Sequence, residues 1–234
     1  LSGFIAPARH TKALRDTPRS AGREIIIAAG LDSAAEKLGA DVVYSYDVNV
    51  VDLASDYEAH WRRGKRKQMA PVEKARRKCK EFEVVIDGAG DLEWGLLAWR
   101  DMWADDAEGE VCAYPDRLRF WNAIRSQSPT HENDLRLHTL SVRDGSRVTA
   151  CVIFVRQNKN LFWQCTSRDA EYNRFGVGTY ALDAALQWAQ RQGFHTADLA
   201  GGGGFKAEWA PHGGQRYGAI FRPGPIRFFR KFNG

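Results

Sequence analysis

The stretch Asn173-Arg174-Phe175-Gly176-Val177-Gly178-Thr179 stands between a run of extended sequence and a well-patterned helix. Glycines at such a junction let the backbone approach a ligand, and the N–H groups of the helix start point toward it. Together with the helix dipole they suit a pyrophosphate. A Gly-x-Gly alone is also common in ordinary tight turns. A Walker A motif is excluded because no Gly-Lys-Ser/Thr follows, and the Rossmann motif fits poorly because no βαβ unit precedes the glycines.

The segments around these glycines predict an antiparallel meander, then a helix, then further strands. Residues 135–142 alternate apolar and polar, and Asp144-Gly145 is predicted as the hairpin turn into the return strand. Gly193 is the expected C-cap of the helix. The expected elements, in order, are strands at 135–142, 148–155 and 161–165, a helix at 179–191, a strand at 195–199, a glycine loop at 201–204, a helical turn at 205–209 and a strand at 215–221.

The first half of the chain reads as a small lobe followed by helices. Val42-Val43-Tyr44 is a predicted strand. A helical stretch begins at Asp52 and contains Pro71, which should kink or divide it because proline lacks the N–H donor. A strand at 82–86 and helices at 91–103 and from Pro115 onward come next. Residues 1–50 are too few for a core of their own, so they should pack on the rest of the chain.

The composition is that of an ordinary globular chain. Of its 234 residues, 44% are hydrophobic and 27% are charged, and no run of 18 apolar residues occurs, so no membrane span is expected. The net charge of +5 favours an anionic partner. The four cysteines and six histidines are scattered, which predicts reduced, mostly buried thiols in a cytoplasmic protein and no metal site.

The order of these elements, with the glycine loop between meander and helix, resembles the GNAT acyltransferase fold. In that family the loop reads Gln/Arg-x-x-Gly-x-Gly/Ala and cradles the pyrophosphate of coenzyme A (CoA). Here Gly176 and Gly178 match, and Asn173 stands where Gln or Arg is usual. The resemblance implies an α/β (α+β) fold with a mixed, mostly antiparallel sheet flanked by helices. It also implies acetyl-CoA or another acyl-CoA as co-substrate, and no metal.

Four segments resemble the CelD-like acetyltransferase family, whose members are relatives of the Fem aminoacyl-tRNA-dependent peptidyltransferases. They are Val51-Asp52-Leu53, the basic stretch Trp61–Lys80, Leu137-His138-Thr139-Leu140, and residues 197–209 with their glycine run and Phe205-Lys206 pair. The match covers roughly residues 50–222. It implies that residues 1–50 belong to a second, degenerate GNAT-like lobe and that residues 51–234 form the acyltransferase core.

The resemblance implies a catalytic role for Lys206. In the Fem relatives the lysine of the matching pair is proposed to stabilise the oxyanion of the acyl-transfer intermediate, and a fixed cation facing that oxygen offsets the developing charge. Asp198, at the end of a predicted strand beside the cleft, is a candidate general base for the attacking amine. The same position also suits a structural aspartate that accepts N–H bonds from the glycine loop.

Two further groups complete the expected site. The donor cradle comprises Asn173, Arg174, Phe175, Gly176, Val177, Gly178 and Thr179. The substrate-binding candidates are Trp163 and Gln164 on the last meander strand, Phe205 beside Lys206, and Tyr217, whose phenol could protonate a leaving thiolate. Alternate residues of segment 163–166, including Thr166, should face the donor or acceptor, and the others the core.

Ten basic residues and one acidic residue lie between Trp61 and Lys80. The commonest reading of such a run is a solvated helix face. A second reading is contact with an anionic acceptor or with the 3′-phosphate of CoA. A third is binding of tRNA, which would be steeply dependent on salt.

These features favour an enzyme that moves an acyl group, expected to be acetyl, from acyl-CoA to an amine acceptor by direct attack. No cysteine stands beside a histidine in the cleft segments, which argues against a thiol intermediate. Aminoacyl-tRNA as the donor is the second hypothesis. A non-catalytic binding module on a GNAT scaffold is the third, because a fold does not fix a function.

Overall fold

The computed structural model describes residues 42–54, 66–102, 114–126, 135–200, 205–210 and 212–220. The chain divides into two compact units: Asn49–His212, and a second unit of Leu1–Val48 with Gly213–Gly234. The larger unit carries the candidate site. Most of the predicted N-terminal lobe lies outside the described residues, so the domain boundary after residue 50 stays a prediction.

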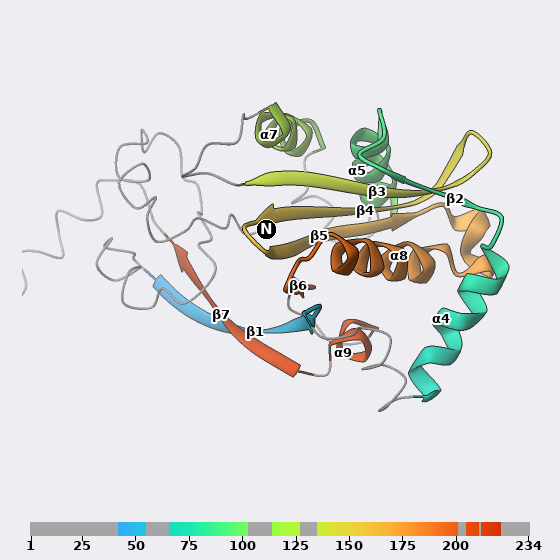
Figure 1. Cartoon of the computed structure of the whole chain (residues 1–234). Helices are drawn as coiled ribbons and strands as arrows, with labels where there is room; N and C mark the ends of the chain where they lie inside the picture. Colours follow the sequence, from blue (N-terminus) through green and yellow to red (C-terminus); the bar gives the residue numbers. More distant parts are fainter. Residues whose placement is uncertain are drawn as a thin grey trace, which may run out of the picture. The chain divides into compact units, whose positions relative to one another are not determined.

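A mixed sheet forms the centre of the larger unit (Figure 1). Its strands run in the order β2-β3-β4-β5-β6-β1. Their bounds are β1 Val42–Asp52, β2 Glu83–Ile86, β3 Arg136–Asp144, β4 Arg147–Gln157, β5 Asn160–Arg168 and β6 Thr196–Asp198, and β7 (His212–Ile220) follows β1 in the strand order. The pairs from β2 to β5, and β6 with β1, are antiparallel, whereas β5 and β6 are parallel. The predicted sheet and its meander, β3-β4-β5, are therefore confirmed.

Helices cover both faces of this sheet (Figure 1). They are α4 (Arg66–Lys78), α5 (Asp91–Met102), α7 (Tyr114–Ser126), α8 (Val177–Arg191) and the short α9 (Phe205–Trp209). On β4, Cys151 and Ile153 lie next to Gly95 of α5, whereas Val152 and Phe154 belong to the hydrophobic core shared with α8. Because β4 is covered on both faces, its sequence is a continuous apolar run rather than an alternating one.

Helix α8 buries the apolar stripe that its sequence predicts. Its buried residues include Val177, Ala181, Leu182, Ala185, Leu186 and Ala189, which recur at the three- and four-residue spacing of a helix face. Gly193 follows the C-cap residue Gln192 and adopts φ 73°, a left-handed conformation that glycine takes at no steric cost. None of the helices in the described part of the chain is long and apolar enough to cross a membrane.

The prediction that a helix begins at Asp52 is wrong, and Pro71 does not divide the helix that contains it; a kink at Pro71 stays a prediction. Asp52 is the last residue of β1, where it pairs with Thr196, and its Oδ1 accepts the N–H of Ala54 at 2.9 Å. Pairing across the sheet outweighs the local preference for a helix start. Helix α4 continues through Pro71 to Lys78. Proline at this position removes one helical hydrogen bond, and the packing of Met69 and Val72 in the core holds the helix against that loss.

The hairpin between β3 and β4 differs from the prediction by one residue. Asp144 pairs with Arg147, so the loop consists of Gly145 and Ser146. Gly145 adopts φ 59°, the positive value that the first loop position of a two-residue hairpin requires. The sequence identified the right glycine but placed it at the second loop position.

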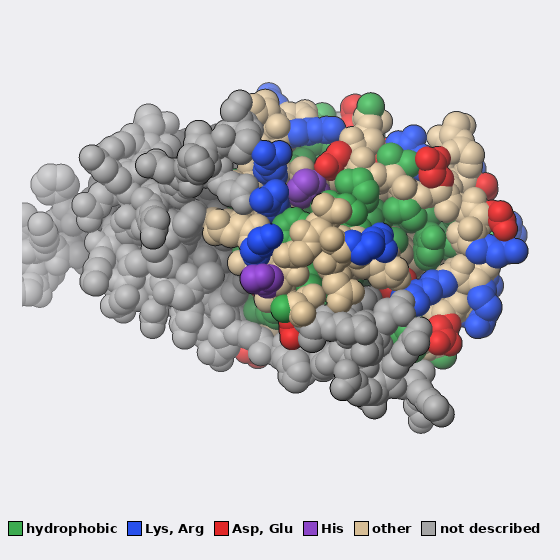
Figure 2. Space-filling view, in the orientation of Figure 1, with side chains coloured by type: hydrophobic (Ala, Val, Ile, Leu, Met, Phe, Trp, Pro, Cys, Tyr) green, Lys and Arg blue, Asp and Glu red, His purple; other side chains and the backbone are tan. Residues whose placement is uncertain are grey.

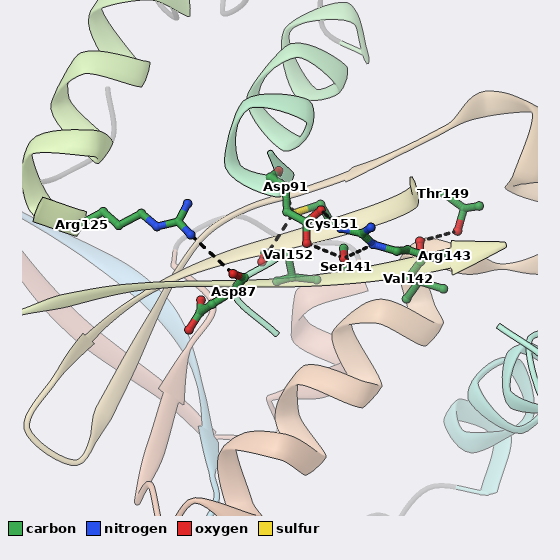
Figure 3. Close-up of polar contacts among 9 residues, drawn as sticks. All are labelled: Asp87, Asp91, Arg125, Ser141, Val142, Arg143, Thr149, Cys151 and Val152. Carbon is green, nitrogen blue, oxygen red and sulfur yellow. Dashed lines mark hydrogen bonds and ion pairs between the residues drawn. The ribbon is translucent and has the colours of Figure 1, made fainter. Parts of the chain in front are cut away.

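Helix α5 is anchored to the sheet by a buried carboxylate at its first residue (Figure 3). Asp91 is 1% exposed and accepts hydrogen bonds from Ser141 Oγ at 2.7 Å and from Arg143 Nη2 at 2.5 Å. The Cys151 thiol lies 3.6 Å from the Asp91 carbonyl oxygen. The carboxylate of Asp91 therefore ties the helix start to β3, and the backbone carbonyl of Asp91 contacts β4.

Replacing Asp91 with alanine should strongly destabilise the chain. The change leaves the hydroxyl of buried Ser141 and the mostly buried guanidinium of Arg143 without their acceptor, which costs about 2–4 kcal/mol of unfolding free energy. Asp101→Ala is the matched control on the same helix. Its partner Arg100 is exposed, so the loss should be below about 0.5 kcal/mol. Urea denaturation of the two variants measures both values, and equal losses would contradict the anchoring role of Asp91.

Candidate active site

Strands β5 and β6 part near the middle of the sheet. Their parallel pairing covers only Asn160 to Phe162 on β5, and Phe162 opposite Asp198 is the last pair. β5 continues to Arg168, whereas the chain beyond β6 bonds to β1: Leu199 N–H donates to the Asn49 carbonyl at 2.8 Å. The second half of β5 therefore presents a backbone edge that β6 does not cover.

A β-bulge lies at the same place. Trp163 pairs with Phe154 and Cys165 pairs with Ile153, so Gln164 is an extra residue on β5. Residues three apart on a regular strand face opposite sides, but the extra residue reverses this relation. Trp163 and Thr166 pair with β4 residues two apart, Phe154 and Val152, and so lie on the same face of the sheet, the face covered by α8.

The glycine loop forms a tight junction between two helices. A 3₁₀ helix (Ala170–Phe175) ends at Gly176, whose φ of 76° and ψ of 34° are left-handed, and α8 begins at Val177. The helix starts two residues before the predicted position. The N–H groups of Val177, Gly178 and Thr179 therefore occupy its first turn, where no carbonyl of α8 lies four residues earlier, and this turn contains no acidic residue. This is the geometry of an anion site at a helix N-terminus.

The three residues before these glycines hold the loop together. Asn173 accepts a hydrogen bond at Oδ1 from Arg168 Nε at 2.7 Å, and its carbonyl accepts the N–H of Gly176 at 3.0 Å. The Phe175 ring packs 5.6 Å from that of Phe82, and the Arg174 guanidinium lies 4.9 Å from the Phe175 ring centre. Donor binding by these three side chains stays a prediction, but their contacts show that they shape the loop.

Helix α4 supports the loop from outside the sheet. An ideal Cβ placed on Gly176 would lie 3.3 Å from Ala75 Cβ, so a glycine lets the helix approach closely. Arg76 forms two hydrogen bonds, 2.7 and 2.9 Å long, with the buried carboxylate of Asp183 on α8. Lys78 Nζ donates to the Arg174 carbonyl. Two residues of the basic stretch, Arg76 and Lys78, thus have structural partners.

Lys206 and Trp163, predicted from separate parts of the sequence, lie together. Lys206 Nζ is 4.1 Å from the centre of the Trp163 ring, a cation–π contact. The indole Nε1–H donates to Thr166 Oγ1 at 2.8 Å, and Thr166 Cγ2 lies 3.9 Å from an ideal Cβ on Gly178. Two contacts, Lys206 with Trp163 and Trp163 with Thr166, therefore lead from the lysine to a residue that lies beside Gly178 at the start of α8; we call this series the Gly178–Lys206 chain.

Asp198 fixes the turn that leaves β6. It is 5% exposed, and its Oδ1 accepts the N–H of Ala200 at 2.6 Å, where Ala200 adopts φ 63°. This contact supports the structural alternative for Asp198. Residues 201–204 and the side chains of Phe205 and Tyr217 lie outside the part of the chain that the structure describes, so the roles predicted for Phe205 and Tyr217 stay predictions.

A second polar cluster lies at the end of β2, and the sequence did not assign it a role. Asp87 Oδ2 lies 2.9 Å from His138 Nδ1, and Asp87 Oδ1 accepts the N–H of Thr139 at 2.8 Å. Burial alone would raise the pKa of Asp87, but the hydrogen bonds from His138 and Thr139 outweigh it and hold this pKa below its usual value. The His138 ring lies 5.1 Å from that of Trp188. The cluster therefore ties β2 and β3 to α8.

The stability contributed by Asp87 should depend on pH. Its pKa is lower in the folded chain than the unfolded value of about 3.9, so ionised Asp87 stabilises the fold above that pH. The contribution is lost as the pH falls through the folded pKa. Asp87→Asn tolerates the left-handed backbone (φ 53°) and should lower unfolding free energy at about pH 6 but progressively less below about pH 4. Urea denaturation across this range measures the difference, and a pH-independent loss would contradict the assignment.

The described cysteines, Cys79, Cys151 and Cys165, are buried, as predicted, and form no disulfide among themselves. Burial raises the pKa of Cys79 to about 11, against a smaller opposing effect of Lys78. Among the described residues, no three His, Cys, Asp or Glu side chains are grouped so that they could hold a metal ion.

The sequence model of the acetyltransferase (GNAT) domain matches residues 62–229, so the chain belongs to the GNAT acetyltransferase domain family. No curated protein sequence matches it. The finer prediction of a CelD-like protein has no support from these matches and stays a prediction.

Solved structures share the fold at low sequence identity. A crystal structure of FemX is similar with a TM-score of 0.56 and 10% identity, covering 99% of this chain and 82% of FemX. The C-terminal domain of a putative lysylphosphatidylglycerol synthetase from Agrobacterium fabrum has a TM-score of 0.53 and 16% identity, covering 97% of this chain and 75% of that one. These likenesses establish the predicted GNAT fold and nothing finer.

Proposed function

We propose that this chain is an N-acyltransferase that moves an acyl group, in the simplest case acetyl, from acyl-CoA to an amine. The observation that carries the proposal is the Gly178–Lys206 chain. It leads from the N-terminus of α8 to a lysine ammonium, beside the point where β5 leaves β6. A donor with phosphates at one end and a reactive carbonyl at the other matches this arrangement.

The donor's diphosphate would bind the N–H groups of Val177, Gly178 and Thr179. The absence of acidic residues from the first turn of α8 favours an anion there. The amide-bearing arm of the donor would run along the uncovered edge of β5, whose backbone groups can pair with amides. Its thioester would then lie near Trp163 and Lys206.

The reaction follows from these positions. The amine nitrogen attacks the thioester carbon, a C–N bond forms, the C–S bond breaks, and the thiolate leaves and takes up a proton. Lys206 would stabilise the negative oxygen of the intermediate, a contribution of about 3 kcal/mol for one well-placed donor. We assign Asp198 to holding the turn after β6, because its Oδ1 already accepts the Ala200 N–H. Water would take up the proton that the attacking amine loses.

Direct attack is favoured over a thiol intermediate. A cysteine nucleophile needs a low pKa and access to substrate. The described cysteines are buried instead, and burial raises the pKa of both Cys79 and Cys151 above the usual value.

Aminoacyl-tRNA is the second candidate donor. Exposed Lys74, Arg77 and Lys80 on and just after α4 favour it, and Figure 2 shows Lys and Arg side chains on the side of the view where α4 lies. This donor would bind through phosphates, so its affinity would fall steeply with added salt.

Thr179 offers a test of the donor cradle that leaves the fold intact. A glutamate at the third position of α8 suits the helix dipole but repels a diphosphate, whereas glutamine has the same shape without the charge. Acetyl-CoA should raise the melting temperature of the wild type and of Thr179→Gln, but not that of Thr179→Glu. A thermal shift assay measures this effect.

Two results would count against this donor. Equal shifts in both variants would mean that acetyl-CoA does not bind at the start of α8. If the wild type shows no shift up to about millimolar acetyl-CoA but binds charged tRNA in a salt-dependent manner, the donor is aminoacyl-tRNA.

Lys206→Ala separates an enzyme from a binding module. We expect transfer of acetyl to a panel of primary amines, followed by release of the CoA thiol, to fall about 100-fold, with the affinity for acetyl-CoA unchanged. Lys159→Ala, at the exposed turn between β4 and β5, is the control and should leave the rate unchanged. Transfer that is unaffected by Lys206→Ala would contradict the catalytic role, and a wild type without any transfer would favour the binding module.

A further inference from the structure

The indole of Trp163 has both of its polar features engaged within the protein. Its ring face lies under the Lys206 ammonium at 4.1 Å, and its N–H donates to Thr166 Oγ1 at 2.8 Å. The ring also packs against the core shared with α8. With its N–H and one ring face engaged, Trp163 is suited to holding the Lys206 side chain in place rather than to binding a substrate.

The place of Lys206 in the chain makes this contact important for the position of its ammonium. It lies on a helix of five residues, α9, which directly follows a run of four glycines in the sequence. At the C-terminal end of α9, Ala210 N–H donates to the Lys206 carbonyl at 3.1 Å, and the Trp209 side chain is buried. These contacts hold the backbone of the helix. The lysine side chain nevertheless has four rotatable bonds, and a cation held over an aromatic face loses most of that freedom.

The bulge at Gln164 makes this arrangement possible. Without the extra residue, Thr166 would point to the opposite face of the sheet from Trp163 and could not accept its N–H. With it, the two branches of Thr166 serve two contacts: Oγ1 accepts from the indole, and Cγ2 lies next to Gly178. The hydrogen bond to Thr166 thereby fixes the plane of the indole relative to β5.

We propose that Trp163 is a positioning residue that holds the Lys206 ammonium for catalysis, and that Thr166 fixes the plane of its indole. The inference rests on the proposed catalytic role of Lys206. The indole face occupies one side of the ammonium, 4.1 Å away, and Trp163 directly follows Phe162, the last residue of β5 that pairs with β6. This role differs from direct substrate binding, which the sequence predicts for Trp163.

The geometry can be tested without any substrate. Reductive methylation with ¹³C-formaldehyde gives each lysine an NMR signal, and Lys206→Arg identifies the signal of Lys206. An ammonium over an indole face should resonate upfield of exposed lysines because of the ring current. We expect Trp163→Leu to abolish this displacement and Thr166→Val, which keeps the branched shape, to reduce it. A wild-type Lys206 signal at the position of exposed lysines would overturn the proposal.

The catalytic consequence is tested by turnover of acetyl-CoA, with the amine panel or with water as acceptor. Misplacing one catalytic group costs up to about 100-fold, so Trp163→Leu should lower kcat at least about tenfold and leave KM for acetyl-CoA within about twofold. In a Lys206→Ala background the same change should have no further effect, because there is no ammonium left to position. A merely structural tryptophan would lower the residual rate as well, and that result would overturn the proposal. Trp94→Leu, on α5, is the control for losing an indole elsewhere.

Conservative variants keep the test decisive if Trp163→Leu fails to fold. Trp163→Phe retains a ring but not the N–H, and Thr166→Val retains the indole but removes the acceptor of its N–H. Each should unfold cooperatively and lower kcat, but by a smaller factor than Lys206→Ala does. If Lys206→Ala lowers turnover but none of the Trp163 and Thr166 variants does, this inference is wrong and the proposed function stands. If the wild type neither binds nor turns over acetyl-CoA, both are wrong.

Discussion

One inserted residue in β5 determines the arrangement of the candidate site. Gln164 has no counterpart on β4, so Trp163 and Thr166 come to lie on the same face of the sheet. The insertion also falls directly after the last parallel pair between β5 and β6. The strand therefore bends and changes its facing pattern at the point where its edge becomes free. The hydrogen bond from Trp163 to Thr166 and the position of Thr166 beside Gly178 require this insertion, since a regular β5 would direct Thr166 toward α5.

The remaining structure keeps the two ends of that chain in place. At one end, α4 approaches Gly176 closely, and Arg76 of α4 pairs with Asp183 of α8. The 3₁₀ helix before Gly176 is capped by Asp169, which accepts the Glu171 N–H. At the other end, Asp198 fixes the turn after β6, and buried Trp209 holds α9. Packing and hydrogen bonds thus hold both ends of the candidate site, as preorganised binding and electrostatic stabilisation require.

The sequence predicted what depends on local periodicity and on single glycines. The meander followed from alternating residues and hairpin turns, and α8 followed from its apolar stripe; both are confirmed. The sequence could not reveal the bulge, because β5 is apolar on both faces where it is covered and no alternation marks the extra residue. The start of α8 at Val177 depends on the positive φ of Gly176. Asp52 ends a strand rather than beginning a helix because it pairs with Thr196 of β6, which lies far along the sequence. The Asp87–His138 contact joins residues 51 apart, beyond any local pattern.

The most direct measurement is a crystal structure of the chain with acetyl-CoA. The account predicts phosphate oxygens within hydrogen-bonding distance of the Val177, Gly178 and Thr179 N–H groups, the amide-bearing arm along β5, and the thioester oxygen facing Lys206 Nζ. Acetyl-CoA bound elsewhere, or bound at α8 with its thioester directed away from Trp163 and Lys206, would contradict it.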